Sequence, residues 1–385
     1  MISRRLFVTK SSLLAAGVTA TAAVSRGNAQ GRLSVPVETI QVISQEPEYY
    51  HGWGTLARDA KGTLYTVASG GRESHVCPFG RVELMRSHDE GRTWTWPEVL
   101  MDTAIDDRDA GICVTPKGSL LVTTFTSLAY ESTLARKGAG WPEERRARWN
   151  AAHNRVNAAQ RAALVDTWML RSPDGGVTWS APYRVPLNSP HGPIALRDGR
   201  LMYAGKELWT EGKHAGISFS SDDGVSWTPL RKLPVRDGDD VALYHELHAV
   251  EAPSGKLIAQ IRNANDNNKG ETLQTESTDG GASWTTPHPI GVWGLPSHLL
   301  RLRSGRLLMS YGYRRAPFGN QARWSDDEGA TWSDPVTISD DAMGGDLGYP
   351  STVELADGAL YTVWYEQLRT SPRAVLRAAR WRLSA

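Results

Sequence analysis

Six glycines recur along this 385-residue chain, and chemically active side chains stand a fixed distance before them. Each glycine separates two apolar runs, as in a tight hairpin turn, at Gly62, Gly118, Gly199, Gly255, Gly305 and Gly358. Nine residues earlier the chain has Trp53, Asp109, Pro190, Glu246, Pro296 and Tyr349. Adjacent positions add Asp107, Arg108, His191, His245, His248, Ser297 and His298. Carboxylates and imidazoles transfer protons and arginines bind anions, so this set indicates a catalytic or binding site.

A second repeat indicates the elements that would position these side chains. The pattern Ser-x-Asp-x-Gly-x-Thr/Ser-Trp, called the box below, occurs at residues 87–94, 172–179, 220–227, 277–284 and 325–332. Its Asp and Gly favour a tight turn in which the Ser and Asp side chains bond the local backbone. Three of the four steps between copies are about 50 residues, the size of a unit that stacks on copies of itself. We interpret the boxes as structural, because they lack the spaced acidic run of a calcium loop.

Together the two repeats predict an all-β fold, a six-bladed β-propeller over residues 31–385. Six hairpins indicate six blades, each a four-stranded antiparallel sheet. The last hairpin is not followed by a box, so we expect a strand at residues 38–42 to complete the last blade. The nine-residue offset then places the chemically active positions at the heads of the innermost strands, around the central channel.

The composition agrees with one large β-domain and argues against nucleic acid as a partner. The chain has 37 Gly, 21 Pro and 15 Trp, and its formal net charge is +1. A near-neutral chain without a basic stripe lacks the electrostatic footprint of a protein that binds phosphate backbones. The two cysteines, Cys77 and Cys113, are weak grounds for a disulfide, and we expect two buried free thiols.

The first 30 residues are typical of an export signal. Arg4 and Arg5 precede an apolar stretch and then small residues, which favours twin-arginine export to a bacterial periplasm or exterior. A chance arginine pair in an ordinary secretory signal is the alternative. In either case the segment is too short to anchor the protein in a membrane, and we expect no membrane span.

One insertion interrupts the repeat in blade 2, over about residues 131–165. Residues 141–164 are rich in Ala, Arg, Glu and Gln and contain no Gly, which predicts a helix. The insertion follows the second strand of its blade, in a loop on the face opposite the boxes. It could cover the central pocket, form a partner surface, or be a solvated addition.

Around the strand heads the chain resembles the sialidase (neuraminidase) superfamily, over about residues 38–382. The segment Gly348-Tyr349-Pro350-Ser351-Thr352, followed by Asp357-Gly358, is similar to the nucleophile segment of that family. The segment His245-Glu246-Leu247-His248, with an arginine sixteen residues after the Glu, is similar to the segment of its catalytic base. The resemblance implies a six-bladed propeller with its boxes on the face away from the active site.

The resemblance also implies roles for individual residues. Tyr349 would be the nucleophile and Glu246 its base, while Arg262 and either Arg314 or Arg315 would bind a substrate carboxylate. Glu366 stands where the family keeps a carboxylate that braces an arginine. A phenol suits this chemistry because a carboxylate nucleophile would be repelled by the acidic group of the substrate.

The chain departs from the family at two positions. The first substrate-binding arginine is missing, because blade 1 has His51-Gly52-Trp53-Gly54 at that place. The general-acid Asp is also missing, and Gly70-Gly71-Arg72-Glu73-Ser74-His75 replaces its loop. Arg72 could supply the lost cation and Glu73 or His75 the proton. Alternatively the acid lies among residues 106–109, as Asp107 or Asp109, unless that charge cluster is a solvated loop with internal salt bridges.

We therefore expect an exported, exo-acting glycoside hydrolase that removes a terminal acidic sugar with retention, sialic acid being the first choice. The alternatives are another acidic glycan, uronic or nonulosonic, processed by hydrolysis or elimination, and a glycan-binding propeller without catalysis. The partner is an acidic oligosaccharide or glycoconjugate, and we expect no cofactor. Further expected substrate-binding residues are Trp53, Arg108, His191, His248 and His298. These histidines come from three blades, so we expect no metal site.

Overall fold

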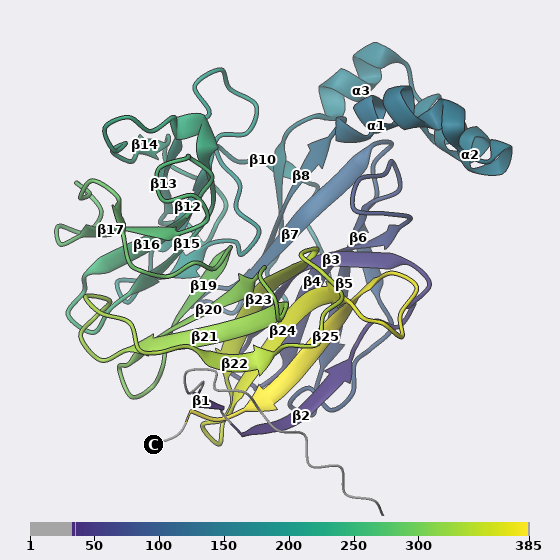
Figure 1. The fold of residues 1–385 in the computed structure, drawn as a ribbon. Helices are drawn as coiled ribbons and strands as arrows, with labels where there is room; N and C mark the ends of the chain where they lie inside the picture. Colours follow the sequence, from purple (N-terminus) through teal and green to yellow (C-terminus); the bar gives the residue numbers. More distant parts are fainter. Residues whose placement is uncertain (1–32, 35, 384–385) are drawn as a thin grey trace, which may run out of the picture. The chain divides into compact units, whose positions relative to one another are not determined.

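The computed structural model describes residues 33–34 and 36–383, and their strands form six sheets. The sheets follow one another along the chain as the blades of a propeller (Figure 1), which confirms the predicted all-β, six-bladed fold. The predicted export signal lies outside the described residues. Within the described range, no helix is both long and apolar enough to cross a membrane.

The first three blades have four strands each, in chain order from the central channel outward. Blade 1 contains β3 (Tyr50–Arg58), β4 (Leu64–Arg72), β5 (Arg81–Ser87) and β6 (Glu98–Met101). Blade 2 contains β7 (Asp106–Val114), β8 (Leu120–Ser127), β9 (Thr167–Ser172) and β10 (Tyr183–Arg184). Blade 3 contains β11 (Ile194–Ala195), β12 (Leu201–Lys206), β13 (Ala215–Ser220) and β14 (Arg231–Lys232).

The remaining blades repeat the arrangement, with two additions from the start of the chain. A short 3-10 helix, Val241–Leu243, precedes blade 4, which contains β15 (Tyr244–Glu251), β16 (Leu257–Asn263), β17 (Thr272–Ser277) and β18 (His288–Pro289). Blade 5 contains β19 (Ser297–Arg301), β20 (Leu307–Tyr313), β21 (Gly319–Ser325) and β22 (Val336–Ser339), extended by β1 (Leu33–Ser34). Blade 6 contains β23 (Leu347–Glu354), β24 (Leu360–Gln367), β25 (Ala374–Trp381) and β2 (Val37–Val42).

The outer strand of blade 6 comes from the start of the described chain. β2 pairs antiparallel with β25, and Ile40 lies opposite Ala379. This confirms the predicted closing strand at residues 38–42. The pairing completes the last sheet with a strand that is distant in sequence, so it joins the two ends of the ring.

The hairpin glycines and the boxes lie at the same end of the blades. All six glycines have φ between +81° and +94°, the left-handed region that favours glycine, as the hairpin prediction requires. In blade 2, the box residue Ser172 pairs with Leu120 at the start of β8, whereas Asp106 at the head of β7 pairs with Ser127 at the end of β8. The boxes and the strand heads therefore lie at opposite ends of the sheet.

Three short helices form the insertion of blade 2, beyond the head end of β7 and β8 (Figure 1). They are α1 (Ala129–Lys137), α2 (Glu143–His153) and α3 (Ala158–Leu164), with a 3-10 turn at Gly138–Gly140. The predicted helical insertion is confirmed, but residues 141–164 form two helices where one was expected. Asn157 accepts a hydrogen bond from the Gln160 amide while the Gln160 side chain accepts one from the Asn157 amide, and this capping box starts a new helix.

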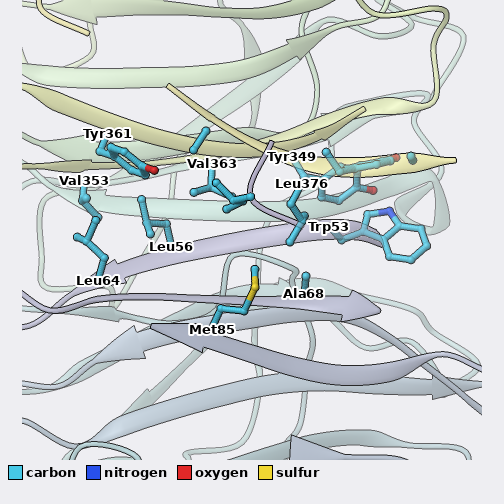
Figure 2. Close-up of a cluster of buried hydrophobic side chains, with 14 of the residues drawn as sticks. Trp53, Leu56, Leu64, Ala68, Met85, Tyr349, Val353, Tyr361, Val363 and Leu376 are labelled. Carbon is cyan, nitrogen blue, oxygen red and sulfur yellow. The ribbon is translucent and has the colours of Figure 1, made fainter. Parts of the chain in front are cut away.

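A buried apolar cluster joins blade 6 to blade 1. It includes Leu56, Val363 and Leu376, and Figure 2 shows Trp53 and Tyr349 at one end of it. Both strand heads are thus anchored on well-packed side chains rather than on a loose loop. Cys77 and Cys113 are both buried and free, as predicted.

The boxes are expected to contribute stability through their Asp side chains. Hydrogen bonds from the hydroxyl and amide of Thr331 hold the pKa of Asp327 at about 2. An unfolded Asp has a pKa near 4, so this contribution is present above pH ~4 and lost as the pH falls toward ~2. We predict that Asp327→Ala lowers the melting temperature by roughly 2 °C at neutral pH, and that the difference disappears near pH ~2.

Calorimetry of the variant beside wild type measures this effect. Asp266→Ala is the control, because the Asp266 side chain is 97% exposed and forms an ion pair with Lys269 at the surface. An equal loss in both variants at neutral pH contradicts the structural role of the box.

Candidate active site

Three strand heads have a left-handed backbone at the same level of the ring. Trp53, Asp109 and Tyr349 have φ of 57°, 49° and 54°, which non-glycine residues rarely adopt. Each lies in a register shift of the innermost strand, between residues 52 and 55, 108 and 111, and 348 and 351. Bulges of this kind redirect a side chain. The same local distortion therefore presents an indole, a carboxyl and a phenol in blades 1, 2 and 6.

The central interaction of the site joins blades 4 and 6. The Tyr349 hydroxyl donates to Glu246 Oε1 at 2.7 Å. Arg262 Nη1 donates to both oxygens of Glu246, at 2.9 and 3.1 Å, and to the Tyr349 hydroxyl at 3.3 Å. The structure thus brings together the three residues that the resemblance places at the centre of the site.

Hairpin geometry explains why Arg262 lies beside Glu246. Leu247 pairs with Ile261 across the turn at Gly255, so an uninterrupted register would place residue 246 opposite residue 262. A shift between His245 and Leu247 moves the pairing by one residue, and His245 becomes the partner of Arg262. The sixteen-residue spacing is therefore the length of chain that runs from the head of the innermost strand, around the hairpin turn, to the facing position on the second strand.

Opposite shifts in pKa fix the resting protonation of the pair. Burial would raise the pKa of Glu246, but Arg262 and the hydrogen bond from Tyr349 hold it below its usual value. Burial and the neighbouring Glu246 raise the pKa of Tyr349 well above that of an ordinary phenol, against the effect of Arg262. At neutral pH the pair is an anionic carboxylate that accepts from a neutral phenol.

Asp109 is the other carboxyl at this level. Its side chain is buried, and Oδ1 has no hydrogen-bond partner among the described residues. Burial raises the pKa of Asp109 to about 6, while Arg108 lowers it and Glu246 raises it. A carboxyl that titrates near pH 6 can both donate and accept a proton at physiological pH.

Arg108 brings a cation to the blade-1 position where the resemblance lacks an arginine. Its guanidinium lies 4.6 Å from the centre of the Trp53 ring and within 4.0 Å of Asp109 Oδ1. The Arg314 guanidinium lies 5.7 Å from the centre of the Tyr349 ring. Arg315 is exposed and lies over the Trp293 ring instead, so Arg314 is the member of the pair that contacts Tyr349.

Other predicted residues of blades 1 and 2, namely Arg72, Glu73 and Asp107, bond to partners outside the Tyr349–Glu246–Arg262 group. Arg72 has no exposed surface and donates to both oxygens of Asp106, at 2.6 and 2.9 Å. Glu73 is bonded to the helical insertion, with Arg145 Nε 2.6 Å away. Asp107 accepts from the amide and hydroxyl of Thr103, and burial raises its pKa to about 8.

A second network borders Trp53, and only His75 of it was predicted. His75 Nδ1 lies 2.9 Å from Asp346 Oδ1, and the Tyr50 hydroxyl lies 3.0 Å from the same nitrogen. The Tyr365 hydroxyl also donates to Asp346. Asp346 and Tyr50 each stand three residues before a strand head, and Tyr365 lies across the Gly358 hairpin from Tyr349. Counting across that hairpin would have found Tyr365.

Lys206 is a further residue that the sequence analysis did not single out. It ends β12, it is buried, and its ammonium donates to the Ala242 carbonyl at 2.5 Å. Burial lowers the pKa of Lys206 to about 8, and Glu246 acts in the opposite direction. Its end position on the second strand of blade 3 is the only signal that the sequence offers.

The predicted histidines form a buried cluster behind Tyr349. The rings of His248 and His298 stack with centroids 4.4 Å apart, and the His191 ring lies 5.3 and 5.2 Å from them. Burial lowers the pKa of His298 to about 3 and those of His191 and His248 well below the usual value, so all three are neutral. In the described part of the chain, no group of His, Cys, Asp or Glu has the arrangement of a metal site.

Glu366 is buried and braces an arginine, but the arginine is Arg377 of the neighbouring strand β25. The same guanidinium also bonds Asp341 at 2.6 Å. Burial raises the pKa of Glu366, and Arg377 lowers it. This carboxylate therefore secures blade 6 next to the site.

Several solved structures share this fold. A protein of unknown function from Dyadobacter fermentans superimposes with a TM-score of 0.74 at 20% identity, covering 91% of this chain and 100% of that one. A Hadza microbial sialidase superimposes with a TM-score of 0.62 at 19% identity, and the match covers 86% of this chain and 66% of that one. The intramolecular trans-sialidase of Ruminococcus gnavus, solved with oseltamivir carboxylate, superimposes with a TM-score of 0.59 at 14% identity. That match covers 92% of this chain and 99% of the other. The chain is thus a propeller of the sialidase type in its fold.

The sequence itself defines the family. Residues 150–362 match the model of the BNR repeat-like domain, and this is more than half of the chain. The chain therefore belongs to the BNR repeat-like domain family. None of the curated proteins compared with it matches.

The ion pair at the centre of the site generates a stability prediction. Arg262→Met leaves the buried Glu246 anion without its cation, and we expect a loss of about 3 kcal/mol at neutral pH. The pKa of Glu246 then rises, so the variant recovers stability relative to wild type as the pH falls and the carboxyl becomes protonated.

A double-mutant cycle with Glu246→Gln, followed by denaturant unfolding, measures the coupling. The double variant should be more stable than Arg262→Met alone. Strictly additive losses contradict the pairing.

Proposed function

We propose that this propeller is a glycoside hydrolase that removes a terminal acidic sugar with retention of configuration, with sialic acid as the first substrate to test. The observation that carries the proposal is the hydrogen bond from Tyr349 to Glu246, which Arg262 contacts at both ends. A pure binding surface has no need of a phenol paired with a base. The sialidases with the same fold support the substrate class.

The reaction would proceed in two displacements. Glu246 takes the phenolic proton as Tyr349 Oη attacks the anomeric carbon, and the bond to the leaving oxygen breaks while Asp109 protonates that oxygen. Water then attacks the anomeric carbon and gives its proton to Asp109, and Tyr349 leaves and recovers its proton from Glu246. Together, the two displacements return every group to its starting state.

The arginines would bind the carboxylate of the substrate. Arg262 and Arg314 flank Tyr349, and Arg108 beside Asp109 supplies the third cation in place of the arginine that Trp53 replaces. Guanidinium groups bind carboxylates in a planar, bidentate manner, which orients the sugar and neutralises its charge.

Trp53 favours a second candidate substrate. An indole at the head of blade 1 changes the shape and charge of the carboxylate pocket, which supports a uronic or other nonulosonic acid in place of sialic acid. A panel of aryl sialosides and uronides distinguishes the two, and analysis of the product for a new double bond separates hydrolysis from elimination.

Tyr349→Phe tests the nucleophile. Removal of the hydroxyl should lower kcat at least about 100-fold while the dissociation constant of a substrate or product changes little, because the ring and the arginines remain. Turnover of a fluorogenic glycoside and calorimetric binding measure the two effects. Tyr361→Phe is the matched control, since Tyr361 belongs to the same blade but bonds Gly91 at the box end. Full activity of the Tyr349→Phe variant would show that Tyr349 is not the nucleophile. If the wild-type protein cleaves no glycoside of the panel, the proposed hydrolase activity is contradicted.

The protonation of Asp109 is expected to determine how kcat/KM depends on pH on the alkaline side. The acid must be protonated in the free enzyme, so kcat/KM should fall as the pH rises above about 6. Asp109→Asn should remove this limb and slow alkyl glycosides at least about tenfold more than aryl glycosides, whose leaving groups need less protonation. If the limb persists in Asp109→Asn and is lost in His75→Gln, the acid is His75.

A further inference from the structure

The segment of residues 73–79, in the connection between β4 and β5, lies between the helical insertion and the strand heads. On one side it carries His75, whose ring packs edge-on against Trp53 at 4.9 Å and whose Nδ1 contacts Asp346. On the other side it carries Glu73, which faces α2. The two side chains are only two residues apart, so the position of one constrains that of the other.

Glu73 has three partners on α2. Arg145 Nε lies 2.6 Å from Oε1 as an ion pair, and Oε2 accepts hydrogen bonds from Arg148 at 3.3 Å and from the Trp149 indole at 3.2 Å. The Glu73 side chain is 15% exposed. A carboxylate with both oxygens occupied in a partly buried setting holds its partners far more firmly than a surface ion pair does.

Apolar packing lies beneath this contact. Cys77 of the segment is fully buried, in one cluster with Trp149 of α2 and Tyr130 of α1. Phe79 packs edge-on against Trp149 at 6.1 Å. The helices therefore cover the segment, and they cannot move away without exposing Cys77.

We infer that Glu73 is a positioning residue, which fastens the helical insertion to residues 73–79 and thereby holds His75 beside the reacting groups. This inference rests on the proposed function for its effect on turnover, but the fastening itself is a separate physical claim. The insertion is then part of the site rather than a surface addition.

Electrostatics connect His75 to the proposed acid. His75 lowers the pKa of Asp109, so a displaced imidazole lets that pKa rise. The other groups that face Asp109 are Arg108 on its own strand, Arg72 on β4, Glu246 on β15, Tyr349 on β23 and Tyr365 on β24. None of these lies on the segment, although Arg72 donates a hydrogen bond to the His75 carbonyl at 3.0 Å. Loosening the segment therefore acts on the pKa of Asp109 mainly through His75.

The first experiment measures the fastening without any substrate. In a Cys113→Ala background, the rate at which a chromogenic disulfide reagent modifies Cys77 reports how often the helices open. Glu73→Gln should raise this rate at least about tenfold over the parent, because the charged contacts to α2 are weakened. Glu144→Gln is the control, since Glu144 bonds the same Arg148 but its side chain is 88% exposed. Arg145→Met tests the contact from the helix side and should match Glu73→Gln. Equal protection of Cys77 in the parent, Glu73→Gln and Arg145→Met overturns the inference.

The second experiment measures the consequence for turnover. Glu73→Gln should lower kcat/KM about tenfold and move its alkaline limb to higher pH, whereas Glu144→Gln should leave both unchanged. A purely structural role lowers the active fraction without moving the limb, and an unmoved limb therefore refutes the positioning of His75. If wild type is inactive on every acidic glycoside, the proposed function fails, while labelling of Cys77 still decides the fastening.

Discussion

Closure of the ring by β2 and β25 is the constraint on which the site depends. Tyr349 and Glu246 stand on blades 6 and 4, and no local element holds them together. Their 2.7 Å hydrogen bond therefore depends on how the blades of the ring, closed by the pairing of β2 with β25, are placed relative to one another. Asp109 adds blade 2 and Arg314 follows the second strand of blade 5. A site shared among so many blades therefore requires the assembled ring.

The same interaction sets the chemistry of the resting protein. Within one hydrogen bond, Glu246 is held as an anion and Tyr349 as a neutral phenol. Moving the proton from Tyr349 to Glu246 leaves the total charge of the pair unchanged, and Arg262 contacts the oxygen atoms of both. A buried site tolerates an internal transfer of this kind better than the loss of a proton to solvent, which would leave a second uncompensated anion.

Local turn chemistry made most of the fold predictable. Short-range turn patterns predicted the hairpin glycines and the boxes, and their count predicted the closing strand. The position of Arg262 follows from counting residues across one of those hairpins. Side chains in long connections follow no such rule. The partner of Arg72 is on another blade, and the partners of Glu73 are on α2, so both depend on tertiary packing that the sequence pattern does not encode. The insertion was predicted as one helix because composition does not locate a cap such as Asn157.

The separation of the boxes from the strand heads has a consequence for how such a protein diversifies. The box turns lie at one end of the sheets, and the residues of the proposed site lie at the other. Replacing a residue such as Trp53 changes the ligand end and leaves the box hydrogen bonds intact. Substitutions at the six strand heads can therefore change ligand specificity without changing the turns that each blade needs in order to fold. The box pattern by which the family is recognised consequently carries no information about the ligand of a given member.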